Sequence, residues 1–137
     1  MVPPMPELTF ADAFATYGAK LRNVQWSVCA DAPDGSLVVS LWRHHFRERA
    51  KDGELICRDS FARWSGPGNA EFREKIANAY RTKQVVRLVI ADTPQTKEVE
   101  GGVDASKLKK TFNVREDLVG EVVEATEDTY AIRFTRR

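Results

Sequence analysis

The chain has 137 residues, of which 42% are hydrophobic and 30% are charged, and its 21 Lys and Arg face 20 Asp and Glu for a formal net charge of +1. This length suits one domain over residues 1–137, and the apolar fraction excludes a disordered polymer. No stretch approaches the roughly 20 apolar residues of a membrane span, and the N-terminus lacks the basic and apolar parts of a signal peptide. We therefore expect a cytoplasmic protein with no membrane partner.

Both cysteines lie inside apolar stretches, Cys29 in WSVCA and Cys57 in ELICR. A domain of this size can bury a sufficient core without a metal or a disulfide, so cross-links are optional. Free cysteine is among the most buried residue types, and a reducing cytosol keeps thiols reduced. The sequence therefore predicts two buried free thiols.

Apolar periodicity and turn signals predict structural elements along the whole chain. Residues 1–8 are rich in proline and are expected to be flexible, and Thr9 is a typical helix N-cap. Asn69 is the predicted N-cap of a second helix, after a Gly-Pro-Gly sequence that breaks regular structure. The predicted elements, in chain order, are a helix over 10–21, a half-buried strand over 24–28, a turn over 31–35, a central strand over 36–46, a polar connection over 47–54, a strand over 55–60, an irregular segment from 62, a helix over 70–82, a strand over 85–91, a loop over 93–102, a short helix over 104–112 and a hairpin over 118–134.

This order of elements predicts an α+β fold in a single domain. Its sheet is expected to be mainly antiparallel, or curled into a small, partly closed barrel, with two main helices and one short helix. The first three strands are expected to pair antiparallel in sequence. A doubly wound parallel sheet is excluded, because strands and crossover helices do not alternate.

The sequence lacks the glycine-rich motifs of nucleotide-binding proteins. Its glycine-rich pieces, WSGPGN and EGGVD, have neither the phosphate-loop spacing nor the dinucleotide-binding spacing. The serine of WSGPG does not lie in a nucleophile elbow, and no cysteine is placed near a histidine in a recognised arrangement. We therefore expect no cofactor, and acyl transfer has no support.

The two histidines, His44 and His45, are adjacent near the end of the predicted central strand. Neighbours on a strand point to opposite faces, so only one of them can join a given site unless the strand ends there. No CxxC or HxxxH pair supplies the core of a zinc centre, and we assign no metal ligands. A metal-assisted hydrolase or nuclease that uses this region, with Cys57 or Asp59 as a further ligand, is the alternative function.

Charge is distributed unevenly along the chain. Residues 41–90 contain eleven bases and six acids, a net charge of +5, whereas the segments on either side each have a net charge of −2. The same central segment is rich in aromatic residues. Basic side chains neutralise phosphates and aromatic rings stack on exposed bases. The leading hypothesis is therefore a binding domain for nucleic acid or another phosphate-bearing ligand.

Candidate ligand-binding residues follow from this hypothesis and lie in or near the loop RDSFARWSGPGN. Arginines would contact anions, aromatic rings would form a wall, and the helix N-terminus would add backbone donors. Asn69 would either cap the helix or bind a base edge. The candidates are Arg43, His45, Arg58, Phe61, Arg63, Trp64 and Asn69. A third hypothesis is a protein-interaction module with Trp42 and Trp64 at an interface.

Three stretches, LTFADAFATYGAKLRNVQWS, LWRHHF and RWSGPGN, carry a resemblance to a group of short bacterial proteins of unknown function. The resemblance covers roughly the first half of the chain and implies no activity and no site. The order of elements also resembles, in outline, the compact barrels of the PUA-like and EVE groups, which read RNA and modified DNA. That second resemblance is one of fold alone.

Overall fold

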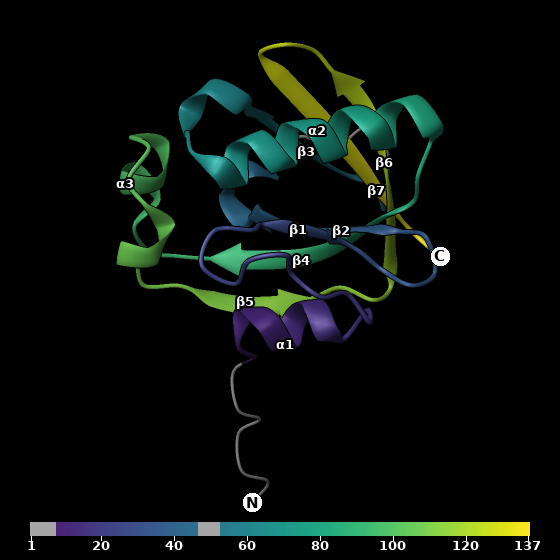
Figure 1. The fold of residues 1–137 in the computed structure, drawn as a ribbon, viewed down its shortest axis with the longest axis horizontal. Helices are drawn as coiled ribbons and strands as arrows, with labels where there is room; N and C mark the ends of the chain where they lie inside the picture. Colours follow the sequence, from purple (N-terminus) through teal and green to yellow (C-terminus); the bar gives the residue numbers. More distant parts are fainter. Residues whose placement is uncertain (1–7, 47–52) are drawn as a thin grey trace, which may run out of the picture.

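Seven strands of the computed structural model, which describes residues 8–46 and 53–137, form one mixed sheet that is not closed (Figure 1). The predicted α+β class is confirmed. The elements are α1 (Phe10–Ala15), β1 (Cys29–Asp31), β2 (Leu37–Trp42), β3 (Leu55–Ser60), α2 (Pro67–Thr82), β4 (Val86–Asp92), α3 (Thr96–Glu100), β5 (Thr111–Val114), β6 (Leu118–Ala125) and β7 (Thr129–Arg136), with short 3-10 helices η1 (Arg43–His45), η2 (Phe61–Arg63) and η3 (Ala105–Lys107).

The strand order is β1-β2-β4-β6-β7-β3, with β5 paired to β4 beside this path. Among the strands of the described residues, only β2 and β4 run parallel, and every other pair is antiparallel. β2 is the predicted central strand, with β1 on one side and β4 on the other. The two ends of β4 pair with different strands on the same side. β5 pairs with the C-terminal half of β4, and β6 pairs with β4 at its first residue, Val86.

Helices cover both faces of the sheet, as Figure 1 shows with α2 above and α1 below β1, β2 and β4. Under α2, Phe72 and Ile76 pack in a cluster with buried side chains that include Leu88. Under α1, Phe14 and Val38 belong to a second cluster. Successive residues of a strand point to opposite faces, so β2 and β4 supply both clusters.

The second predicted element, a strand over 24–28, is wrong: this segment is a turn. The Asn23 carbonyl accepts hydrogen bonds from the amides of Trp26 (3.3 Å) and Ser27 (2.8 Å), and the Asn23 side chain accepts one from the Gln25 amide at 2.8 Å. Such local bonds compete with strand pairing. The alternation of apolar residues here is therefore not that of a strand, and β1 begins at Cys29.

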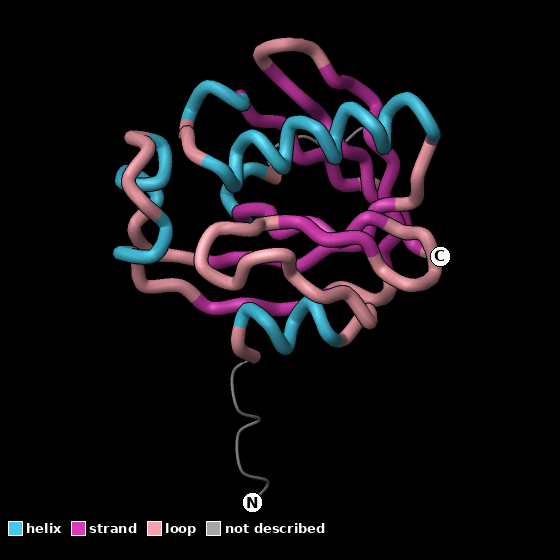
Figure 2. The backbone as a smooth tube through the Cα atoms, in the orientation of Figure 1, coloured by secondary structure: helices cyan, strands magenta, loops and turns pink. Residues whose placement is uncertain are grey.

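Helix α1 is shorter than predicted. Thr9 is its N-cap, as expected, and accepts a hydrogen bond from the Asp12 amide at 3.1 Å. The helix ends at Ala15, because Gly18 has a φ of +75° and turns the chain away. From there to β1 the chain is mostly loop and turn (Figure 2).

The expected pairing of β3 with β2 is also wrong. β3 pairs with β7 over six residues, from Leu55 opposite Phe134 to Ser60 opposite Thr129. Both edges of β2 are already occupied, and β3 therefore lies at the far edge of the sheet. Of the polar connection predicted before β3, residues 47–52 lie outside the described residues.

The second half of the chain follows the prediction in part. α2, β4 and the β6–β7 hairpin across Glu127-Asp128 are confirmed. The loop predicted over 93–102 contains α3, and the helix predicted over 104–112 is divided into η3 and the start of β5. Strand pairing with β4 takes Thr111 and Phe112 out of the helix.

The remaining sequence predictions concern the cysteines, the N-terminus and membrane spans. Cys29 and Cys57 are buried free thiols, as expected, and burial raises the pKa of both. Leu8 forms an isolated bridge with Phe112, and residues 1–7 of the segment predicted to be flexible lie outside the described residues. None of the described helices has the length and apolar character needed to cross a bilayer.

Candidate functional site

A cleft of about 960 Å³ lies between the turn that contains Trp26, the start of α2, the end of β2 and the segment after α3. All three tryptophans of the chain, Trp26, Trp42 and Trp64, line this cleft, and each is half-buried. Ligand pockets are typically lined by aromatic side chains with a few polar groups. We call this feature the tryptophan cleft.

Trp64 is positioned by the chain reversal between β3 and α2. Ser60 caps η2 by accepting a hydrogen bond from the Ala62 amide at 3.1 Å, and the Trp64 ring packs against Phe72 with centroids 6.2 Å apart. Gly66 then has a φ of +106°, which directs the chain into α2. The Gly-Pro-Gly sequence, which predicted an irregular segment, therefore helps to place Trp64.

Gly68 allows the other wall of the cleft to come close. A Cβ atom at this position would lie 2.2 Å from the Trp26 carbonyl oxygen and 3.4 Å from the Trp64 ring. No other residue type fits this approach without movement of the backbone. The first turn of α2 and the Trp26 turn are thus held side by side.

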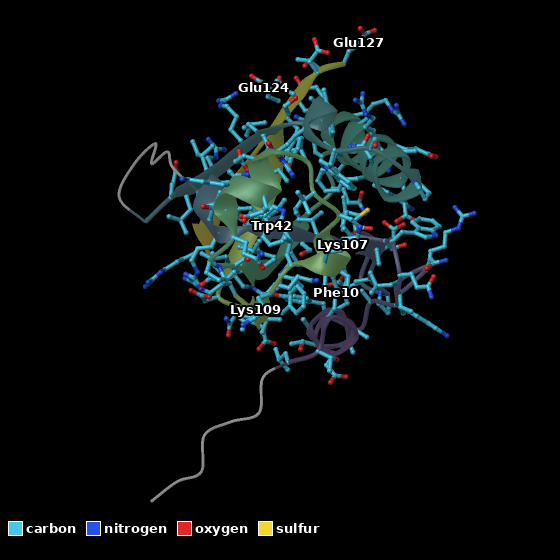
Figure 3. The ribbon with its side chains drawn as sticks, turned by 90° about the vertical axis from the view of Figure 1, so that its left-hand side faces the viewer. Phe10, Trp42, Lys107, Lys109, Glu124 and Glu127 are labelled. Carbon is cyan, nitrogen blue, oxygen red and sulfur yellow. The ribbon has the colours of Figure 1, made fainter. Side chains whose placement is uncertain are left out.

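Trp42 is the last residue of β2, and its register partner on β4 is Ala91. Phe10 and Phe112, which pack with ring centroids 4.9 Å apart, line the same cleft. Figure 3 labels Trp42 and Phe10 on the side of the molecule that carries α3. The floor of the cleft therefore joins the sheet end to α1.

Arg63 is a largely buried cation that lines the cleft. Its guanidinium contacts Asp59 at 2.9 Å and donates to the Val99 carbonyl at 3.0 Å, with 12% of the Arg63 and 7% of the Asp59 side chain exposed. Gly102, with a φ of +79°, approaches so closely that a Cβ there would lie 2.8 Å from the Arg63 carbonyl oxygen. These contacts hold the segment after α3 against η2.

A histidine–carboxylate cluster adjoins Arg63. Nε2 of His45 lies 2.8 Å, and Nε2 of His44 3.1 Å, from the same oxygen, Oε2 of Glu100. On its other side, Nδ1 of His45 lies 3.6 Å from Asp59 Oδ2. Burial lowers the pKa of His45, and Glu100 and Asp59 oppose this shift.

Both histidines reach one carboxylate because β2 ends at Trp42. His44 and His45 continue as the 3-10 helix η1, in which neighbouring side chains are not forced to opposite faces. The exception that we allowed for a strand end therefore applies. Glu100, which completes the cluster, was absent from the predicted sites, because nothing in its spacing connects it to residues 55 and 56 positions earlier.

The positive central segment does not form one unpaired basic face among the described residues. Four of its described bases pair with acids, and three of these four acids come from the negative flanks. The pairs are Arg43–Asp92, Arg58–Glu124, Arg63–Asp59 and Lys75–Asp31. Arg47, Arg49 and Lys51 lie outside the described residues. Folding thus places acids of the two negative flanking segments beside bases of residues 41–90.

The predicted site residues are brought together only in part. Arg63 and Trp64 line the cleft, and His45 contacts Asp59, the partner of Arg63. Arg58 is bound to Glu124 on β6, and Arg43 to Asp92 at the end of β4. Trp26 is one of the cleft residues that sequence reasoning missed, since it was assigned to a strand.

Two further candidates have structural positions. Phe61 is 2% exposed and packs against Tyr130 with centroids 4.9 Å apart. Asn69 is 6% exposed; its side chain donates to the Phe61 carbonyl at 2.8 Å and accepts from Arg73 Nε at 2.9 Å. The predicted N-cap role of Asn69 is wrong, because Gly66 occupies that position.

Asn69→Ala is expected to lower the free energy of unfolding by about 2 kcal/mol, because it leaves the buried Phe61 carbonyl without its donor. Asn78→Ala on the same helix is the control, since among the described residues the Asn78 side chain accepts a hydrogen bond only from the exposed Arg81. Urea denaturation measures both variants. Equal stability of the two would show that the Asn69 bonds do not hold the loop.

A comparison of the chain with protein-family models, curated proteins and solved structures found no match.

Proposed function

We propose that the tryptophan cleft binds an unpaired base of a nucleic-acid strand. The observation that supports this proposal is that every tryptophan of the chain lines one cleft, although Trp26 and Trp64 are far apart in sequence. Half-buried indoles offer flat apolar faces, and stacking on aromatic rings is the main way in which proteins hold single-stranded bases. The cleft volume of about 960 Å³ leaves room for a base beside the indoles.

Cations beside the cleft supply the contact with phosphates. Lys110 lines the cleft and donates to the Ala105 carbonyl at 2.5 Å, while Lys107 and Lys109 are exposed. Figure 3 labels both exposed lysines on the face that also carries Trp42. The cationic part of the proposed site thus comes from 107–110, outside the segment that the charge pattern indicated.

The direct test is fluorescence anisotropy with short labelled single-stranded RNA and DNA, some with modified bases, and with a DNA duplex. We expect single strands to bind more tightly than the duplex. With three phosphate contacts, raising salt from about 50 to about 200 mM should weaken binding roughly 20-fold. Absence of salt-sensitive binding at micromolar protein would contradict the proposal.

Trp64→Ala is expected to weaken binding of the single strand by roughly 5- to 150-fold, the loss of one base–aromatic stack. Trp42→Ala, at the end of β2, should act similarly and provides a second variant that does not disturb the contact of Trp64 with Phe72. Tyr80→Ala is the matched control, because Tyr80 is an aromatic residue on α2 that is 49% exposed and outside the cleft.

The result that would contradict this prediction is unchanged affinity in both tryptophan variants. If sedimentation shows instead that the wild type self-associates and the tryptophan variants do not, the cleft is a protein interface. The monomer–oligomer equilibrium of all three variants should therefore be measured in the same buffers.

A further inference from the structure

The histidine–carboxylate cluster has the composition of a metal site. The ligand atoms of His44, His45 and Glu100 all lie within 4.8 Å of one another. Two imidazole nitrogens point at a single carboxylate oxygen, at 3.1 and 2.8 Å. Imidazole and carboxylate together are the donor set of catalytic zinc sites with two histidines and one glutamate.

Two of the three distances between the ligand atoms, those to Glu100, are close to the spacing in a zinc site. Zinc–ligand bonds of about 2.0–2.2 Å put neighbouring ligand atoms of a tetrahedron roughly 3.3 Å apart. The two nitrogen–oxygen distances to Glu100 are only slightly shorter, so small side-chain movements would admit the ion. Among the described residues the cluster offers three ligands to such an ion.

Asp59 has the place of an outer partner that orients a metal-binding histidine. Its Oδ2 lies 3.6 Å from Nδ1 of His45, and Arg63 holds the same carboxylate at 2.9 Å. Metal-binding histidines almost always present their second ring nitrogen to such a group. A proton on Nδ1 of His45 leaves its Nε2 lone pair directed toward Glu100.

The two carboxylates around His45 agree with this assignment. A neutral imidazole has one N–H. With that N–H on Nδ1, on the side of Asp59, Nε2 offers a lone pair to an ion that the Glu100 carboxylate also binds. The side chains of His45, His44 and Glu100 are 3%, 20% and 42% exposed, so the cluster is buried on one side and open to solvent on the other.

We propose that Nε2 of His44, Nε2 of His45 and the Glu100 carboxylate bind a divalent transition-metal ion of the zinc class, with Asp59 as the positioning residue for His45. The ion would tie the short helix α3 to the end of β2. This site is separate from the tryptophan cleft, and the inference does not depend on nucleic-acid binding.

Isothermal titration of the untagged, chelator-treated full-length protein with ZnCl2 tests the proposal, together with the absorption spectrum of the Co²⁺ complex. We expect one ion per chain, a rise in Tm on loading, and visible Co²⁺ bands that report imidazole and oxygen ligands. His44→Ala and Glu100→Gln are both expected to weaken binding at least 100-fold, and Asp59→Asn to weaken it 10- to 100-fold.

Glu98→Gln is the matched control, because Glu98 is an exposed acid on α3 outside the cluster and should leave the affinity unchanged. Circular dichroism verifies that each variant is folded before titration. Sub-stoichiometric binding by the wild type, or equal affinity in wild type, His44→Ala and Glu100→Gln, would overturn the proposal. Rescue of the Glu100 site by Glu100→Asp at reduced affinity would support it further.

Discussion

Asp59→Ala is expected to lower the free energy of unfolding by about 3–5 kcal/mol, because it leaves the charge of Arg63 without its buried partner. Arg63 has 12% of its side chain exposed and links η2 to the Val99 carbonyl, so the loss should extend to the wall of the tryptophan cleft. Nδ1 of His45 would also lose its neighbouring carboxylate. Chemical denaturation and nucleic-acid titration measure the two consequences.

Asp92→Ala is the control for this prediction. Asp92 pairs with Arg43, another predicted site residue, but their side chains are 46% and 53% exposed. A surface pair of this kind contributes about 0.2–1 kcal/mol, since water screens both charges. Equal destabilisation by the two substitutions would show that the Asp59–Arg63 pair is no more important than a surface contact.

Gly68→Ala is expected to destabilise the protein by about 3 kcal/mol, the upper end of the usual cost of overpacking. The added Cβ would lie 2.2 Å from the Trp26 carbonyl oxygen, and a backbone atom cannot move aside as a flexible side chain can. The start of α2 and the Trp26 turn must then separate. The cleft should widen, and affinity for a single strand should fall with stability.

Gly101→Ala makes the same change where a Cβ fits. Its nearest neighbour would be the Lys97 carbonyl oxygen at 3.4 Å, and Gly101 has an ordinary φ of −82°. We expect a change within about 0.5 kcal/mol, as for other surface substitutions. Thermal denaturation compares the two variants directly. A Gly68→Ala variant as stable as Gly101→Ala would contradict the close approach of Gly68 to the Trp26 carbonyl.

Local signals in the sequence predicted local structure well. Thr9 caps α1, Asp34-Gly35 makes the β1–β2 turn, and both apolar parities of β2 correspond to burial on two faces. Each of these features depends on a few neighbouring residues. The errors arose where a local bond competes with periodicity, as at Asn23, or where partners are distant in sequence, as for β3 and β7.

The candidate site was only partly predictable for the same reason. Arg63 and Trp64 were found because an arginine and an indole lie beside a glycine-rich bend. Glu100 and Trp26 come from other elements, and a single sequence gives no signal that residues so far apart in the chain lie close together in the fold. The charge of the central segment overstated the cations that are left for a ligand, since Arg43, Arg58 and Lys75 pair with acids from the flanks.

The most direct test of the tryptophan cleft as the binding site is the NMR spectrum of its indole N–H groups. The chain has three tryptophans, so the spectrum has three indole signals, and all three side chains line the cleft. On titration with a short single-stranded oligonucleotide, we predict that all three signals move together and saturate at one strand per chain. Binding that leaves the three signals unmoved would contradict this assignment.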